Sequence, residues 1–216
     1  MITAAPEEVA AYTAKVVFNL TPASFPTNID ADIVAIALER LEYCFSKIWL
    51  KHFRQGQKSL FNYLNGDHYA MFLWFLGNTI WQRREDEDTA VRLSLVNKAL
   101  HGIDLHYNVQ MPDIFLLAHP VGTVVGRAEF SDYLVIYQGV TIGSDGIAFP
   151  AFRGPTILYA GAAVIGNCCV EQDVTFGAHA LVVNQSIPAH SVVTGRTPDL
   201  TVRNSTLSVL SAQFLG

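Results

Sequence analysis

Histidines in the second half of this chain of 216 residues carry most of its capacity for acid–base chemistry. A histidine takes up and releases a proton near neutral pH, so His119 is a candidate general base. His106 lies two residues after Asp104, on the same face if this stretch is extended, and is a candidate for a supporting role. A zinc site would need His106, His119 and His179 to converge, and the sequence has no Cys-x-x-Cys or His-x-x-x-His pair. We therefore expect no metal.

Two regions of different composition must position these residues. All lysines precede residue 103, together with most of the acidic residues, and Gly102 marks the boundary. We predict a helical region over residues 1–102, a repeat domain over 103–200 and a tail over 201–216. Half of the residues are hydrophobic and 15% are charged, which excludes intrinsic disorder. The net charge of −5 argues against a dedicated binder of nucleic acid or anionic membranes.

The first region predicts helices. Between Asp30 and about Gln55, apolar residues recur at a spacing of 3.6 residues, and Asp30 is a suitable N-cap. Further helices are predicted over residues 67–84 and from 88 or 89 to 101, the last ending at Gly102. The first 25 residues are too irregular to assign.

The second region repeats every six residues. Bulky side chains stand at every sixth position in two runs, with small residues between them: Val124, Phe130, Ile136 and Ile142, then Phe152, Leu158, Val164, Val170, Phe176 and Val182. This period is typical of a parallel β-helix with a triangular cross-section, in which short strands stack coil upon coil. Residues 143–151, between the two runs, predict a loop that leaves the coil, and such loops commonly carry function.

Several segments of this region resemble the hexapeptide-repeat acyltransferases, and among them the serine O-acetyltransferases. The similar segments are residues 118–126, 137–143 and 160–167, and Ile187-Pro188 with Gly195 and Pro198. The resemblance extends from about residue 102 to 199. It implies a mixed fold, in which a helical N-terminal region precedes a left-handed parallel β-helix of hexapeptide repeats.

The resemblance also implies a catalytic dyad. In the family an aspartate and a histidine fifteen residues apart form this dyad, and Asp104 and His119 have that spacing. His119 would be the general base and Asp104 the carboxylate that orients it. A hydroxyl group is a poor nucleophile at neutral pH, so a base must remove its proton as it attacks a thioester. A carboxylate on the far ring nitrogen fixes the tautomer of the base and stabilises the imidazolium.

The acceptor site departs from that of serine acetyltransferases. Those enzymes have aspartate before the catalytic histidine, where this chain has Ala118, and an Arg-His pair in the loop, where it has Ala148 and Phe149. A free amino acid needs charged partners, whereas an aromatic ring suits a sugar face. We expect His106, Ala118 and Phe149 at the acceptor site. The predicted acceptor is a sugar hydroxyl or amine of a surface polysaccharide or its precursor, and serine is the alternative.

Family members bind coenzyme A in the groove between neighbouring β-helices of a trimer. The resemblance therefore implies acetyl-CoA as donor and a homotrimer, or a dimer of trimers. Small residues would leave room for the pantetheine arm, and a cation would meet the phosphates. The small residues in comparable places are Gly143, Ala160, Ala162 and Ala178, and the candidate cation near the C-terminal end is Arg196.

Two other functions remain open, namely a non-catalytic β-helix scaffold and a β-helix zinc enzyme. The chain lacks the docking tail ending in isoleucine by which serine acetyltransferases bind a partner enzyme, so that partnership is not expected. It begins without a basic and apolar leader, has no apolar stretch long enough to span a bilayer, and has three cysteines. We therefore expect a reduced, cytoplasmic protein.

Overall fold

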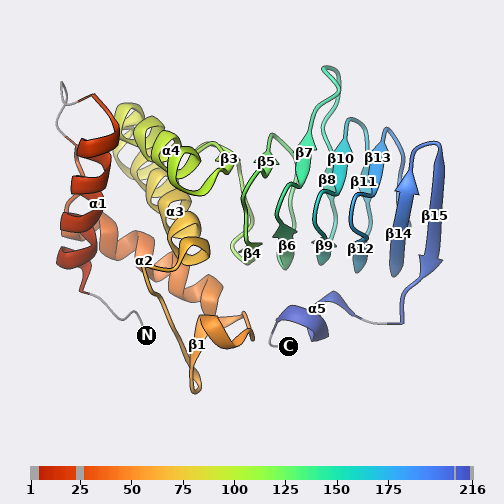
Figure 1. Ribbon diagram of the computed structural model, residues 1–216, viewed down its shortest axis with the longest axis horizontal. Helices are drawn as coiled ribbons and strands as arrows, with labels where there is room; N and C mark the ends of the chain where they lie inside the picture. Colours follow the sequence, from red (N-terminus) through yellow and green to blue (C-terminus); the bar gives the residue numbers. More distant parts are fainter. Residues whose placement is uncertain (1–4, 23–26, 207, 215–216) are drawn as a thin grey trace.

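Helices form one end of the molecule and a parallel β-helix forms the rest (Figure 1). The computed structural model describes residues 5–22, 27–206 and 208–214. The predicted fold class is confirmed, because the helical region leads into a parallel β-solenoid of about five turns.

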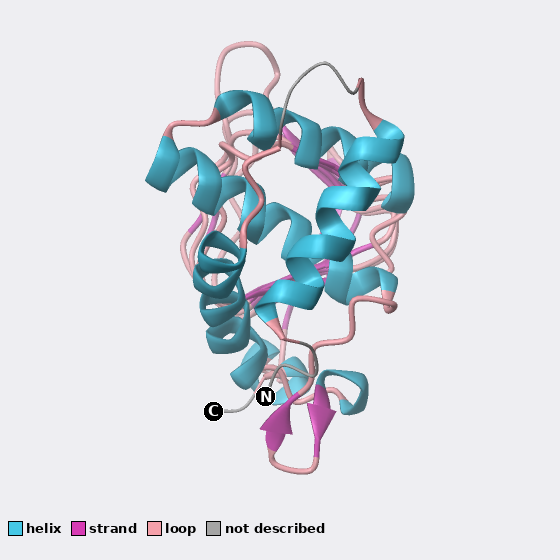
Figure 2. Ribbon diagram, turned by 90° about the vertical axis from the view of Figure 1, so that its left-hand side faces the viewer, coloured by secondary structure: helices cyan, strands magenta, loops and turns pink. Residues whose placement is uncertain are grey.

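The helical region contains α1 (Pro6–Leu20), α2 (Ala31–Ser46), α3 (Gly66–Arg84) and α4 (Glu87–His101), which face the viewer in Figure 2. Every residue of α3 from His68 to Ile80 is buried, since α2 and α4 both pack against it. The predicted cap of α2 is confirmed, because the Asp30 carboxylate accepts the amide of Ile33 at 3.1 Å. The predictions for α3 and α4 are confirmed to within two residues, and Gly102 ends α4 with a left-handed φ of 65°.

The start of the chain and the end of α2 differ from the predictions. α1 lies where no element was assigned, and residues 1–4 and 23–26 of that stretch fall outside the described residues. The helix predicted to about Gln55 ends at Ser46, because Ile48 forms a β-bridge with Phe214 and the Trp49 amide donates to the Gln213 carbonyl. A contact with a distant segment leaves no signal in the local pattern. A 3₁₀ turn (Lys51–Phe53) and a hairpin of β1 (Arg54–Gln55) and β2 (Lys58–Ser59) follow.

The solenoid consists of short strands that pair in parallel from one coil to the next. They are β3 (Asp104–Leu105), β4 (Phe115–Ala118), β5 (Val124–Val125), β6 (Leu134–Tyr137), β7 (Thr141–Gly143), β8 (Ala151–Phe152), β9 (Thr156–Leu158), β10 (Ala163–Ile165), β11 (Cys169–Val170), β12 (Val174–Phe176), β13 (Leu181–Val183) and β14 (Ser191–Arg196). An antiparallel partner of β14, β15 (Asp199–Asn204), closes the far end. The boundary predicted at residue 200 therefore falls inside β15.

The side chains at every sixth position stack inside the solenoid, as predicted. Ile142, Val164 and Val182 are in register on β7, β10 and β13, and all three are fully buried. One position of the first coil is predicted wrongly, because Val124 is 42% exposed, whereas Phe130 is partly buried and stacks on Phe152. Val125 points inward in place of Val124 and pairs with Ile142.

The phase shifts because the first coil is one residue shorter on this side. Val125 and Ile136 are eleven residues apart in the sequence, whereas Val164 and Phe176, which occupy the same places two coils later, are twelve apart. Counting back in steps of six from Ile142 therefore reaches Val124, one residue before Val125, whose side chain points inward.

The loop predicted between the two runs is confirmed at residues 144–150, where the chain projects from the solenoid (Figure 1). The Asp145 carboxylate organises this loop, because it accepts the amides of Ile147 and Ala148 and the side-chain amide of Asn184, each at 2.9 Å. These hydrogen bonds, the Ala148 amide first, lower the pKa of Asp145 to about 2.

Residues 208–214, the C-terminal strap, return along the solenoid to the helical region (Figure 1). Asp173 accepts the amide of Val209 at 2.6 Å, at the start of α5 (Val209–Gln213). The Phe214 ring then packs against Tyr133, with 5.2 Å between ring centroids. No described helix has both the length and the apolarity to cross a bilayer.

Candidate functional site

One edge of the solenoid is a stack of tight corners, where the chain passes from the β4, β6, β9 and β12 side to the β5, β7, β10 and β13 side. A backbone ladder joins these corners: the amides of Gly139, Gly161 and His179 donate to the carbonyls of Val121, Gln138 and Ala160. Four residues at equivalent positions on successive coils have φ between 59° and 76°, a conformation that glycine adopts readily. They are Gly122, Gly139, Gly161 and His179.

Two additional residues, His119 and Pro120, interrupt the first of these corners. Phe115 and Val124 lie on either side of it and are nine residues apart. The equivalent positions on the next three coils are seven residues apart: Leu134 and Thr141, Thr156 and Ala163, Val174 and Leu181. His119 and Pro120 therefore form a corner insertion that has no counterpart on those three coils.

The corner insertion presents His119 at the surface. Its side chain is 77% exposed, and its φ is 50°, in the left-handed region that few residues with a side chain adopt. The imidazole Nδ1 lies 3.6 Å from Oδ2 of Asp67, in the first turn of α3. His119 is thus free to reach a ligand and faces a carboxylate of the helical region.

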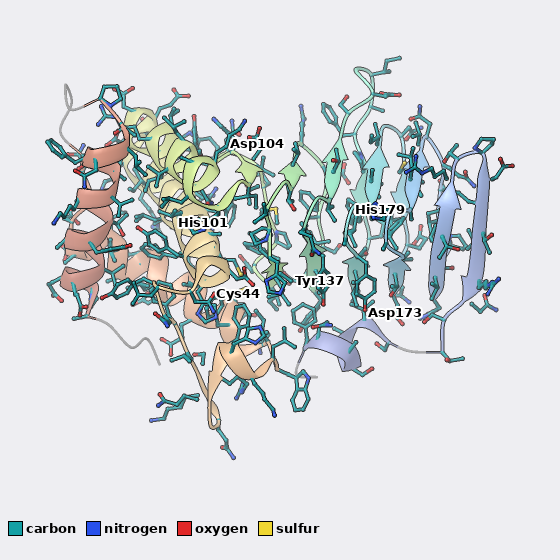
Figure 3. The ribbon with its side chains drawn as sticks, viewed as in Figure 1. Cys44, His101, Asp104, Tyr137, Asp173 and His179 are labelled. Carbon is teal, nitrogen blue, oxygen red and sulfur yellow. The ribbon has the colours of Figure 1, made fainter. Side chains whose placement is uncertain are left out.

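The contact predicted between Asp104 and His119 is not made. Asp104 starts β3, at the junction of helices and solenoid (Figure 3), and its Oδ2 lies 2.6 Å from the Nζ of Lys98 on α4. Both residues of the predicted dyad are described, and no ion pair within 4 Å joins them. The Asp104 backbone instead joins the segment after the corner insertion, because its amide donates to the carbonyl of Thr123.

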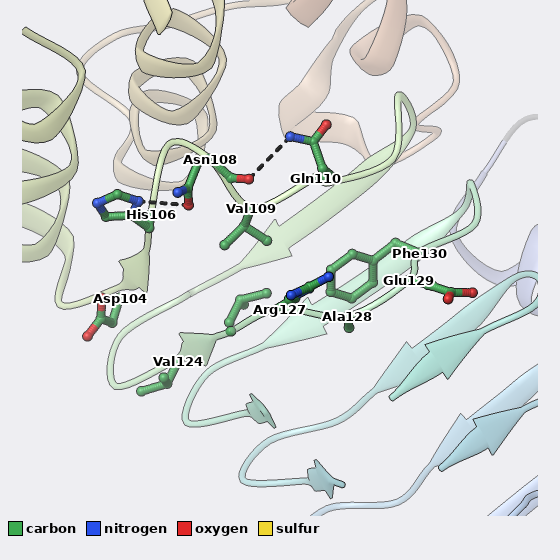
Figure 4. A pocket seen from close by; sticks show the side chains of 12 residues that line it. Asp104, His106, Asn108, Val109, Gln110, Val124, Arg127, Ala128, Glu129 and Phe130 are labelled. Atoms are coloured by element: carbon green, nitrogen blue, oxygen red, sulfur yellow. Dashed lines mark hydrogen bonds between the residues drawn. The ribbon is translucent and has the colours of Figure 1, made fainter. Parts of the chain in front are cut away.

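A groove of about 940 Å³ opens beside Asp104 on the solenoid surface (Figure 4). His106 lines it, and its Nδ1 is 2.8 Å from Oδ1 of Asn108. Arg127 lines the same groove, and its guanidinium lies 4.8 Å from the ring centroid of Phe149, which is 41% exposed. The groove thus joins two residues expected at the acceptor site, His106 and the loop residue Phe149, through Arg127. Ala118, the third, is buried beside the corner insertion.

The residues expected to bind coenzyme A lie in three settings. Ala160 and Ala178 follow one another along the stacked corners, and Ala178 is exposed. A Cβ atom added to Gly143 would have no neighbour within 4 Å, so its surface is open. Arg196 is exposed at the end of β14. Ala162 is fully buried, because its side chain points into the solenoid core, and it offers no side-chain surface in this chain.

Sequence reasoning missed Asp67, Lys98 and Arg127. Asp67 is an acidic residue in the first turn of a helix, and Lys98 is a basic residue in the last turn of another. These common patterns predict where a helix begins and ends, but not which residues of other elements the side chains contact. Arg127 stands where the repeat pattern predicts only a surface position.

The remaining titratable groups are chiefly structural. Burial raises the pKa of the Cys44 thiol to about 12, and Cys168 is also buried, consistent with packing roles. Burial lowers the pKa of His101, which packs behind the first turn of α3. Over the described ranges, no three His, Cys, Asp or Glu side chains lie close enough together to hold a metal ion.

Comparison with known proteins supports the resemblance to serine acetyltransferases. A serine acetyltransferase of Staphylococcus xylosus is 33% identical over 108 residues, which make up 48% of this chain and 50% of that protein. One from Mycobacterium tuberculosis is 32% identical over 135 residues, or 60% of this chain and 55% of that protein. The chain thus spans about half the length of the curated relatives it matches. No family model matches it.

Solved structures agree in fold along most of the chain. A serine acetyltransferase from Brucella abortus superimposes with a TM-score of 0.68 at 20% identity, covering 92% of this chain and 84% of the other. A serine acetyltransferase in complex with cysteine gives 0.71 at 18% identity (95% and 84% covered). Another, in complex with CoA, gives 0.65 at 18% identity (89% and 83% covered). The resemblance predicted from the sequence is confirmed.

Proposed function

We propose that this chain, similar in sequence to serine acetyltransferases and folded like them, transfers an acetyl group from acetyl-CoA to a hydroxyl group. The observation that carries the proposal is the corner insertion. It places one exposed imidazole, that of His119, at the head of the stacked corners, where Val121 and Gln138 come first and the small residues Ala160 and Ala178 follow on the later coils. A general base next to an open, narrow surface is what attack on an extended thioester requires.

In the proposed reaction His119 removes the proton of the acceptor hydroxyl as its oxygen attacks the thioester carbonyl. The acetyl–sulfur bond then breaks, the acetyl–oxygen bond remains, and the imidazolium returns its proton to the leaving thiolate. The products are the acetylated acceptor and coenzyme A. The resemblance assigns the stabilising carboxylate to Asp104, but in this chain its Oδ2 lies 2.6 Å from the Nζ of Lys98.

Serine is the acceptor that the comparisons favour. The relatives reported above are serine acetyltransferases, and none of these comparisons supports the sugar or polysaccharide role predicted from Ala118 and Phe149. Those two positions still lack the charges expected for a free amino acid. Arg127, stacked on Phe149, supplies a cation in the same groove. A carboxylate group on the acceptor would find its partner there.

The donor would lie along the small residues of the solenoid. Solved serine acetyltransferases of the same fold have been captured with CoA. In this chain Gly143, Ala160 and Ala178 offer open surface for the pantetheine arm, and Arg196 is an exposed cation for the phosphates. A homotrimer would bring a neighbouring solenoid against these surfaces, and sedimentation of the purified protein tests that assembly.

The deciding experiment is release of free thiol from acetyl-CoA by the purified protein, with serine compared against amino sugars and nucleotide-linked sugars. Turnover with serine is the expected result. Turnover with a sugar alone would reinstate the sugar acceptor. No thiol release with any acceptor, together with no binding of acetyl-CoA, would contradict the proposal and favour a non-catalytic scaffold.

A further inference from the structure

The first turn of α3 faces the corner insertion. Asn65 caps this helix, its side chain accepting the amides of Asp67 and His68. This cap fixes Asp67 in the first turn, where its side chain is 16% exposed and its Oδ2 lies 3.6 Å from Nδ1 of His119. The contact joins the helical region to the solenoid.

The setting of Asp67 is favourable for a carboxylate side chain. The first turn of a helix presents unpaired amides and the positive end of the helix dipole, which favour a negative charge. The ring of His101 lies behind this turn, 3.5 Å from where a Cβ atom of Gly66 would be. Burial lowers the pKa of His101, while the nearby Asp67 carboxylate acts in the opposite direction.

Asp104, by contrast, already has a partner. Its carboxylate is 2.6 Å from the ammonium of Lys98, and its side chain is 48% exposed, three times the exposure of Asp67. A carboxylate paired with lysine in solvent attracts an imidazolium less than an unpaired and partly buried one.

We propose that Asp67 is the positioning residue for His119, so that the working carboxylate–imidazole pair is built across the junction of helices and solenoid. The inference rests on the proposed function, because it gives His119 its orientation for that reaction. The present 3.6 Å is an ion-pair distance, longer than a hydrogen bond. Since the imidazole is largely exposed, a small rotation brings Nδ1–H onto the carboxylate. The proton is then held on Nδ1, and Nε2 is left free to accept the proton of the acceptor hydroxyl.

The tautomer of His119 tests this assignment without any need for activity. The protein is labelled with ¹⁵N-histidine, and the His119 signals are identified by their loss in His119→Ala. We expect the neutral imidazole to carry its proton on Nδ1 in the wild type and in Asp104→Ala, and this Nδ1–H population to fall in Asp67→Ala. An unchanged tautomer in Asp67→Ala, or a change only in Asp104→Ala, would overturn the assignment.

Kinetics provide the second readout. Asp67→Ala should lower kcat at least about 10-fold with the KM of both substrates changed less than about 3-fold, and Asp67→Glu should recover part of the loss. Asp67→Asn keeps the shape of the side chain without its charge, and it replaces Asp67→Ala if that variant does not fold. Equal kcat in wild type and Asp67→Asn would contradict the proposal. If the wild type releases no thiol at all, the proposed function fails while the tautomer still decides the role of Asp67.

Discussion

Ala118 and Tyr137 lie opposite each other on β4 and β6, yet the residues that continue the ladder beyond them are Val121 on one coil and Gln138 on the other. The two residues left over are His119 and Pro120. Because the solenoid closes its corners without them on the next three coils, their presence on the first coil serves something other than the stacking of the coils.

Deletion of His119 and Pro120 together should therefore leave the solenoid folded and remove its activity. The shortened corner would have the seven-residue spacing of the following coils, so we expect a circular dichroism spectrum like that of the wild type and no thiol release. Deletion of Gln138 and Gly139, which belong to the ladder, is the control and should abolish folding. A deletion variant without His119 and Pro120 that remained active would remove His119 from the mechanism.

His119→Ala should reduce turnover by at least about 100-fold while the sedimentation coefficient and the affinity for acetyl-CoA stay unchanged. Loss of the base removes proton transfer, whereas an exposed side chain contributes little to folding. Steady-state thiol release and sedimentation check both parts. His52→Ala, which alters an exposed histidine of the helical region, is the matched control and should have wild-type activity.

Gly143→Ala should weaken the use of acetyl-CoA without affecting stability. Among the described residues the new methyl group has no neighbour within 4 Å, so it can meet only a bound ligand or a neighbouring protomer. We expect an unchanged melting temperature and a KM for acetyl-CoA raised about 10-fold. An unchanged KM would place the pantetheine arm elsewhere.

Gly154→Ala is the contrasting variant for that experiment. Its Cβ atom would lie 2.6 Å from the Cβ and 2.9 Å from the Cα of Gln172, one coil away. Since backbone cannot yield as a flexible side chain can, we expect a loss of at least about 2 kcal/mol in the free energy of unfolding.

Acidification should destabilise the protein through His68. This side chain is fully buried against Phe45 and Phe53, and its Nε2 has no hydrogen-bond partner. Burial lowers the pKa of His68 from 6.5 to about 4. Between these pH values, His68 is protonated in the unfolded chain and neutral in the folded chain. The free energy of unfolding should therefore fall between pH 6.5 and 4, by up to about 3 kcal/mol. Denaturant titrations at several pH values should show that the free energy of unfolding of His68→Phe changes less with pH over this window than that of the wild type. An equal pH dependence in both proteins would exclude His68 as the cause.

Ala118→Asp tests the acceptor. If serine is the substrate, a carboxylate next to His119 should attract its ammonium group and lower the KM for serine. Ala118→Asn, similar in size but uncharged, separates charge from volume. If the KM for serine rises in both variants, a carboxylate at position 118 does not bind the ammonium group of the acceptor.

Local pattern was enough to predict most of the fold. The six-residue period, the caps at Asp30 and Gly102 and the loop after Gly143 are all encoded within a few residues of where they act. The early end of α2 was not predictable, because the backbone of Ile48 and Trp49 pairs with residues of the strap, which come from the far end of the chain.

The site was predictable only in part, for the same reason. The motif around His119 predicts the base, but its neighbours depend on how α3 and α4 dock on the first coil. That docking brings Asp67 to His119 and Lys98 to Asp104, and neither pairing has a sequence spacing that marks it. The inward burial of Ala162 likewise follows from the register of the coils, which composition alone does not reveal.

The C-terminal strap changes what kind of repeat protein this is. A solenoid normally has a free last coil, and each unit is held only by its neighbours, so unravelling can begin at that end and travel inward. Here Asp173 on a late coil holds the start of α5, and Phe214 bridges to Ile48 of the helical region. The linear array is thereby closed into a ring of contacts, in which the last coil cannot loosen unless the strap also leaves the helices.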